Sequence, residues 1–218
     1  MHIFWTPAKG YGSRGDFRVD WIFIHYTAGK YPSDLNYLAR SPKPACPSCH
    51  FYIRKNGDVH WMVRLENAAW HAGITWSRPY TWQWERWRAL RTNERSVGIE
   101  IENLGNEVFT QEQYQALGLL IPTLCYKYGL PIATMPDPWL GCNHKERADF
   151  YPIEELNEFR GLLAHGNTHK SKVDPGVLFE WDRIKSLEPI PDPGCLNLIQ
   201  HVITFGDPKV FEKGMAYA

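Results

Sequence analysis

Two short apolar runs, far apart in the chain, constrain the fold more than any other feature. The first is "VDWIFIH" at residues 19–25, and the second is "SVGIEIEN" at residues 96–103. Runs rich in β-branched and aromatic residues are typical of strands buried inside a sheet. We therefore predict two central strands. The first presents His25 at its carboxyl end, and the second carries Glu100 and Glu102 at alternate positions, hence on one face.

Turn and helix signals surround these strands. In "HFYIRKNGDVHWMV" the pair Asn56–Gly57 predicts the turn of a β-hairpin. The capping-box pattern "TQEQ" opens a long helix at Thr110, and Gly129 ends it. Strands of parallel type mixed with a hairpin indicate an α/β fold, with a mixed central β-sheet flanked by helices. Shorter helices are predicted at residues 33–40 with Ser33 as the N-cap, at residues 153–159, and after residue 174.

Composition narrows the class of protein. The chain has 218 residues, 44% of them hydrophobic, which suits one domain with elaborations. Lys+Arg and Asp+Glu balance at 24 each, so the broad positive field that favours nucleic-acid binding is missing. No apolar stretch is long enough to span a bilayer, and no standard secretion signal precedes the first strand. Together with five cysteines, an odd number, this predicts reduced thiols and synthesis in the cytoplasm.

The segment "LAHGNTHKSKVDPG" at residues 163–176 is too polar for the core and rich in potential metal ligands. His165 ends a strand-like piece, and Asp174 follows nine residues later. With His25 they make two imidazoles and one carboxylate, a set that suits catalytic zinc, with a fourth position left to water. The alternative is a hydrogen-bonded histidine at a strand end and an exposed loop acid, because ligands far apart in sequence form a weak signature.

Five motifs carry a resemblance to a known family. "FIHYTAG", "CHFYIRKNGDVHWMV", "AAWHAG", "SVGIEIEN" and "HGNTHKSKVDPG" occur in the order found in the zinc-dependent N-acetylmuramoyl-L-alanine amidases, which include phage lysozyme-type amidases and peptidoglycan recognition proteins. The resemblance covers residues 19–187. It implies that His25, His165 and Asp174 are zinc ligands. It also implies hydrolysis of the amide between the lactyl group of N-acetylmuramic acid and the L-alanine of the stem peptide.

Two catalytic roles follow from the same resemblance. Glu100 corresponds to an acid/base that takes a proton from the attacking water and returns one to the leaving amine. Lys172 corresponds to a lysine that steadies the developing oxyanion. From the residues alone, Glu102 shares the face of Glu100, and Lys170 is a rival to Lys172. Many relatives have a tyrosine where this chain has Cys49, so catalysis is expected to depend on Glu100 rather than on a tyrosine.

The "AAWHAG" loop borders the substrate groove in proteins of this family. The resemblance therefore implies a substrate-binding role for His71 and its neighbour Trp70, while an ordinary loop histidine is the alternative. An aromatic insert at residues 76–93 has no counterpart that we recognise. Its tryptophans either stack on saccharide rings or bury the insert against the sheet.

A second metal site is a further possibility in the sequence. "CPSC" and "CNH" could close a structural zinc site between two proline-rich loops. Free thiols in reducing surroundings are the alternative. The four residues of this candidate site are Cys46, Cys49, Cys142 and His144.

The sequence thus predicts a monomeric amidase domain at residues 1–187 and a C-terminal extension of unknown role at residues 188–218. Its substrate is peptidoglycan or a muropeptide, its cofactor Zn²⁺, and nucleic acid is not a partner. The rival function is a recognition module that binds muropeptides without cutting them. The protein is expected to act either in the cytosol on soluble muropeptides or on the cell wall after release, as a phage endolysin does. The aromatic insert, which would widen a groove for polymer, slightly favours the lytic role.

Overall fold

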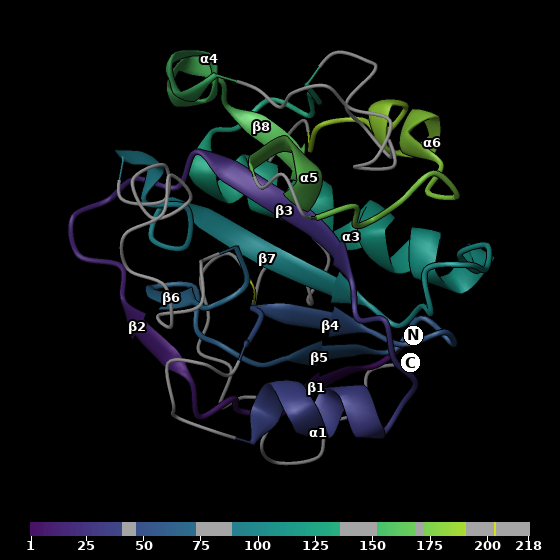
Figure 1. The fold of residues 1–218 in the computed structure, drawn as a ribbon. Helices are drawn as coiled ribbons and strands as arrows, with labels where there is room; N and C mark the ends of the chain where they lie inside the picture. The colour runs from purple at the N-terminus through teal and green to yellow at the C-terminus, as the bar shows by residue number, and fades with distance from the viewer. Residues whose placement is uncertain (41–46, 73–88, 136–151, 169–171, 191–202, 204–218) are drawn as a thin grey trace.

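The computed structural model describes residues 1–40, 47–72, 89–135, 152–168, 172–190 and 203. Six strands form a central sheet in the order β1-β5-β4-β7-β3-β8 (Figure 1). Among these strands only β4 and β5 pair antiparallel, which confirms the predicted mixed sheet. The strands are β1 (Ile3–Trp5), β5 (Val59–Trp61), β4 (Phe51–Ile53), β7 (Ser96–Ile101), β3 (Trp21–Tyr26) and β8 (Gly161–Ala164).

The main core lies between one face of the sheet and the helices α3 (Gln111–Tyr128) and α6 (Trp181–Lys185). Figure 1 shows α3 behind the sheet. Alternate residues of the central strands point to this side. Full burial of each large apolar side chain contributes about 1.5–3 kcal/mol, so these positions hold the sheet on the helices. They include Ile22 and Ile24 of β3, Val97, Ile99 and Ile101 of β7, and Phe51 and Ile53 of β4.

The opposite face of the sheet carries helix α1 (Ser33–Ala39), whose Leu35 and Leu38 pack with Tyr52 of β4. Side chains alternate along a strand, so His25 of β3 and Glu100 of β7 also point to this side. A two-stranded sheet of β2 (Tyr11–Ser13) and β6 (Asn67–Ala69) and the short helices α4 (Ile153–Glu158) and α5 (His165–Thr168) complete the described fold. Among the described helices, none combines the length and hydrophobicity that a bilayer span requires.

Most of the predicted local signals are confirmed. Thr110 accepts a hydrogen bond from the backbone N–H of Gln113, whose side chain accepts one from the N–H of Thr110, and this capping box starts α3. Gly129 ends that helix in the left-handed conformation at φ 59°. The hairpin of β4 and β5 turns at Asn56–Gly57, with Gly57 at φ 80°.

Two helix predictions are corrected. Ser33 is not the N-cap of α1: the helix begins at Ser33, Pro32 precedes it, and no side chain caps it. The helix predicted after residue 174 is shorter than expected, because Pro175 and Gly176 open a series of turns and α6 begins only at Trp181. Most of the predicted aromatic insert and of the C-terminal extension lies outside the described residues.

Candidate metal centre

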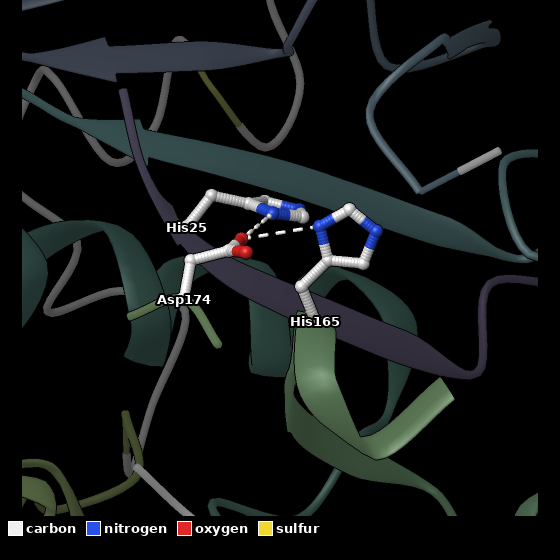
Figure 2. Close-up of side chains that lie close together, drawn as sticks. All are labelled: His25, His165 and Asp174. Atoms are coloured by element: carbon white, nitrogen blue, oxygen red, sulfur yellow. Dashed lines mark hydrogen bonds and ion pairs between the residues drawn. The ribbon is translucent and has the colours of Figure 1, made fainter. Parts of the chain in front are cut away.

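Three buried side chains meet at the carboxyl ends of β3 and β8. His25 lies near the end of β3, His165 directly follows β8, and Asp174 lies in the next loop. Asp174 Oδ2 is 2.7 Å from His25 Nδ1 and 3.1 Å from His165 Nδ1 (Figure 2). One ligand atom from each residue lies within 4.8 Å of the others. The structure thus brings together the three side chains that the sequence put forward as a metal-binding set.

Backbone contacts explain how residues so far apart in sequence converge. β3 and β8 are parallel neighbours, with Ile24 opposite Ala164, so the residues that follow on each strand emerge at the same edge. The N–H of His165 then donates to the carbonyl of Asp174 at 3.1 Å, which folds the loop back onto the strand end. The side chain of Asn167 accepts from the N–H of Ala164 at 2.7 Å and fixes the intervening turn.

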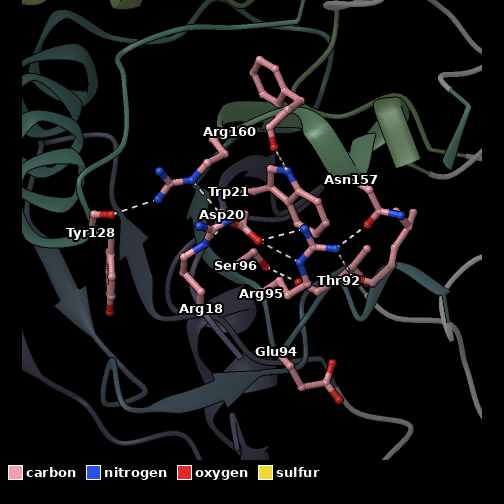
Figure 3. A network of polar contacts seen from close by, with 12 residues as sticks. Arg18, Asp20, Trp21, Thr92, Glu94, Arg95, Ser96, Tyr128, Asn157 and Arg160 are labelled. Carbon is pink, nitrogen blue, oxygen red and sulfur yellow. Dashed lines mark hydrogen bonds and ion pairs between the residues drawn. The ribbon is translucent and has the colours of Figure 1, made fainter. Parts of the chain in front are cut away.

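The amino ends of the same strands are fixed by a buried carboxylate, Asp20 (Figure 3). Its oxygens accept from Arg18 at 2.7 Å, from Arg95 at 2.8 Å and from Arg160 at 3.3 Å. Its N–H donates to the carbonyl of Arg95, and its carbonyl accepts from the N–H of Gly161. Because Asp20 precedes β3, Arg95 precedes β7 and Gly161 starts β8, this network sets the register of three strands. The pairing of these strands in turn fixes where the candidate site residues at their carboxyl ends lie relative to one another.

Electrostatics keep the candidate ligand carboxylate ionised. Burial alone would raise the pKa of Asp174. The charges of His165 and His25 and their hydrogen bonds to the carboxylate outweigh burial and hold that pKa well below its usual range. Asp174 therefore offers a fixed negative charge between two imidazoles.

This donor set fits a zinc ion. Imidazole nitrogen and carboxylate oxygen are both common zinc ligands, and a tetrahedral zinc ion with bonds of about 2.0–2.1 Å holds neighbouring ligand atoms about 3.3 Å apart. The distances of 2.7 and 3.1 Å from Asp174 Oδ2 to the two imidazole nitrogens are shorter than that separation by about 0.6 and 0.2 Å, so the side chains would move apart slightly to hold the ion.

Glu100 lies beside this set. It is the register partner of His25 on the neighbouring strand and is 9% exposed. Burial, reinforced by the charges of Asp174 and Asp34, raises its pKa to about 7, although His25 and Lys172 act in the opposite direction. Within the described part of the chain its Oε2 atom has no hydrogen-bond partner. Glu100 can thus gain or lose a proton near neutral pH, and one of its buried oxygens makes no hydrogen bond to the described residues.

Glu102, which the sequence pattern could not separate from Glu100, has a different environment. Its two carboxylate oxygens accept from the backbone N–H groups of Tyr31 at 3.1 Å and of Lys55 at 2.9 Å. Both oxygens therefore hold loops in place, and this arrangement favours Glu100 as the residue of the site.

Lys172, two residues before Asp174, is exposed, and its charge acts on Glu100. Its rival Lys170 lies outside the described residues. Trp70 is partly buried, and its main chain is hydrogen-bonded to Ser48. His71 is 5% exposed, and its ring contacts that of His25.

Of the candidate second zinc site, Cys46, Cys142 and His144 lie outside the described residues. Cys49 is buried in a small apolar cluster, where its thiol donates to the sulfur of Met62 at 3.5 Å. Burial raises the pKa of that thiol well above its usual value. The second site stays a prediction.

Sequence reasoning missed a buried pair next to the site, Arg14 and His50. The guanidinium of Arg14 donates to four backbone carbonyls, including that of Ser96 at the start of β7. His50 Nδ1 accepts from the N–H of Gly98 at 3.0 Å, which leaves the proton of the neutral ring on Nε2, 3.1 Å from the carbonyl of Asn67. Burial and the charge of Arg14 lower the pKa of His50 to about 3. No local sequence pattern predicts this pair, because the groups that hydrogen-bond to Arg14 and His50 come from distant segments of the chain.

The low pKa of His50 predicts acid sensitivity. An unfolded histidine takes up its proton below about pH 6.5, but the folded chain does not protonate His50 until about pH 3. The unfolded state therefore binds more protons between these values, and stability falls as the pH falls. From pH 6 to 4, His50 should account for a loss of about 1.4 kcal/mol per pH unit. Urea unfolding with a chelator present should show that smaller slope in His50→Gln, whatever its stability at pH 6. Equal slopes in parent and variant would contradict the assignment.

A mixed α/β sheet, a buried His–His–Asp set and a neighbouring carboxyl with a near-neutral pKa define a candidate metal-dependent hydrolase. Comparison with known families makes this specific. The sequence profile described as N-acetylmuramoyl-L-alanine amidase matches residues 15–177, about three quarters of the chain. The chain belongs to the N-acetylmuramoyl-L-alanine amidase family, and it is an amide hydrolase of that class.

Individual relatives agree with this assignment. The chain is 27% identical over 174 residues to the 1,6-anhydro-N-acetylmuramyl-L-alanine amidase AmpD of Salmonella typhimurium. This alignment covers 79% of this chain and 73% of AmpD. It is 29% identical over 185 residues to the N-acetylmuramoyl-L-alanine amidase AmiD of Escherichia coli, covering 77% of this chain and 52% of AmiD.

Solved structures share the fold. A selenomethionine derivative of AmpD matches with a TM-score of 0.57 and 21% identity, covering 85% of this chain and 93% of that one. The complex of AmiD from E. coli with anhydro-N-acetylmuramic acid-L-Ala-D-γ-Glu-L-Lys matches with a TM-score of 0.52 and 25% identity, covering 84% and 62%. The predicted family and fold class are both confirmed.

Proposed function

We propose that this amidase cleaves the bond between N-acetylmuramic acid and L-alanine at a zinc ion held by His25, His165 and Asp174. Glu100 is the acid/base, and Lys172 stabilises the oxyanion. The observation that carries the proposal is the convergence of two imidazole nitrogens and one carboxylate oxygen beside the buried carboxyl of Glu100. The proposed amidase domain spans residues 1–187, which contains the family match at residues 15–177.

Each residue has a defined task in this mechanism. Bound zinc would polarise the substrate carbonyl and lower the pKa of a water molecule toward neutrality. Glu100 accepts the proton that the attacking water loses and then donates a proton to the leaving nitrogen of L-alanine. A pKa of about 7 suits both transfers, because the carboxyl is then neither a very weak base nor a very weak acid at neutral pH. The ammonium of Lys172 lies where its charge reaches Glu100, and it balances negative charge on the substrate carbonyl oxygen.

The proposed substrate is a soluble muropeptide. Relatives named for 1,6-anhydro-N-acetylmuramyl-L-alanine match over 79% of this chain, and the AmiD complex contains an anhydro-muramyl tripeptide. The likeness to the Clostridium intestinale endolysin LysCS, at 20% identity and a TM-score of 0.52, concerns the fold alone. The balance of similarity therefore favours soluble muropeptides over the polymer that the aromatic insert suggested.

Product analysis tests the proposal. The purified chain, loaded with zinc, is given an anhydro-muramyl tripeptide in one reaction and intact sacculi in another, and new L-alanine amino termini are measured. We expect release from the soluble substrate at a rate well above that from sacculi. Preference for sacculi would favour the endolysin role. Binding of the tripeptide with no release from either substrate would support the non-catalytic recognition module instead.

A further inference from the structure

A chain of hydrogen bonds runs from the start of β7 to the candidate ligand His25. The hydroxyl of Ser96 donates to the carbonyl of Thr92, and its oxygen lies 3.0 Å from His71 Nε2. On the other side of the same ring, His71 Nδ1 lies 3.0 Å from His25 Nε2. Both nitrogens of His71 are therefore engaged inside the protein.

The direction of this chain follows from the number of protons. A hydroxyl has one proton, and that of Ser96 goes to the carbonyl of Thr92. The oxygen of Ser96 therefore accepts from His71 Nε2–H. Neutral His71 then presents the lone pair of Nδ1, which accepts from His25 Nε2–H. With Nε2 protonated and directed to His71, His25 has only Nδ1 to offer a metal ion, which would displace the proton that Nδ1 donates to Asp174 Oδ2, 2.7 Å away, in the absence of metal.

The ring of His71 is held in this position from several sides. It lies directly on the backbone of β7, because a Cβ atom at Gly98 would collide with the ring. The ring of Phe23 packs edge-on against it at 5.5 Å between centroids. The side chain of Asn93 accepts from the N–H groups of His71 at 3.2 Å and of Ala72 at 2.9 Å. His71 is 5% exposed, so this geometry favours a role in positioning His25 over the predicted contact with the substrate.

We propose that His71 is a positioning residue that fixes the tautomer and orientation of His25, so that Nδ1 of His25 faces the metal. It acts through His25 and does not touch the substrate. Such outer partners of a ligating histidine raise the basicity of the ligand and limit its rotation, and their loss typically weakens metal affinity 10- to 100-fold. This inference rests on the zinc site of the proposed function. Its tests measure metal binding, so an inactive protein that binds zinc would leave it intact.

Zinc affinity of paired variants is the first test. His71→Leu keeps bulk but removes the acceptor, whereas His71→Asn places an amide oxygen close to the position of Nδ1. In competition with a chromophoric chelator, we expect His71→Leu to bind zinc 10- to 100-fold more weakly than the parent, and His71→Asn to recover most of that loss. Circular dichroism of the zinc-free proteins establishes that both variants fold. A folded His71→Leu with affinity within twofold of the parent overturns the proposal. Failure of the parent itself to bind zinc would instead remove the proposed site.

The tautomer can be read without any substitution at His71. In the zinc-loaded parent, ¹⁵N NMR should show a protonated Nε2 of His25, with a proton that exchanges slowly because it is buried and hydrogen-bonded. Gly98→Ala should move the ring of His71 and weaken that protection. A deprotonated Nε2 of His25 in the loaded parent would overturn the assignment, even if no variant folds.

Discussion

Replacing Asp174 with alanine should abolish zinc binding and amidase activity together. The carboxylate is the anionic member of the candidate site, and its Oδ2 atom lies within 3.1 Å of both imidazole nitrogens. Without it, two neutral imidazoles would have to hold a doubly charged ion among buried side chains. We expect zinc affinity to fall by more than about 100-fold, beyond the range typical of outer-partner losses, and turnover to fall below about 1% of the parent rate.

The measurement needs a separate readout for folding. The charges of His165 and His25 hold the pKa of Asp174 well below its usual range, so the zinc-free fold also loses a favourable interaction in the variant. Chelator competition and steady-state kinetics should therefore be accompanied by circular dichroism. Asp182→Ala is a matched control, since that carboxylate is 96% exposed on α6, and it should keep both zinc and activity. Stoichiometric zinc with normal turnover in a folded Asp174→Ala protein would refute the ligand assignment.

The sequence is most informative where a structure depends on neighbours in the chain. Thr110 and Gln113 form a capping box within four residues, and the helix that they start was predicted correctly. The strand that carries His25 near its end was also predicted correctly, because one short apolar run covers nearly all of it. Ser33 shows the limit of local signals: it has the chemistry of an N-cap, but the helix includes it as its first residue and Pro32 precedes it.

The site depends on contacts that no local pattern contains. Alternation along β7 places Glu100 and Glu102 on one face, and only the N–H groups of Tyr31 and Lys55, 71 and 47 residues from Glu102, distinguish them. The predicted ligand set came from family motifs rather than from spacing. His71 illustrates the same point, because its burial depends on Gly98, a position whose importance is visible only when the two segments are in contact.

Glu100→Gln should keep zinc and lose turnover, which separates it from the ligand variant. Glutamine matches the size of glutamate but cannot exchange a proton at neutral pH. Within the described residues Glu100 Oε2 has no hydrogen-bond partner, so the substitution should leave the fold nearly unchanged. Loss of a positioned acid/base typically costs 10²- to 10⁴-fold in rate, and we expect kcat for the muropeptide to fall in that range while the zinc content stays at the parent level.

Glu102→Gln is the matched comparison, and its expected defect is in stability. Both oxygens of Glu102 accept backbone N–H groups, and an amide can offer an oxygen to only one of them. The other N–H then faces an NH₂ group, at a cost of about 1–3 kcal/mol in the free energy of unfolding. Urea unfolding should detect this loss, and kcat of the folded fraction should stay near the parent value. Alkaline pH should not restore Glu100→Gln, because hydroxide can replace the lost base but cannot supply a proton to the leaving nitrogen. If Glu100→Gln turned over at the parent rate while Glu102→Gln was inactive, the acid/base role would belong to Glu102.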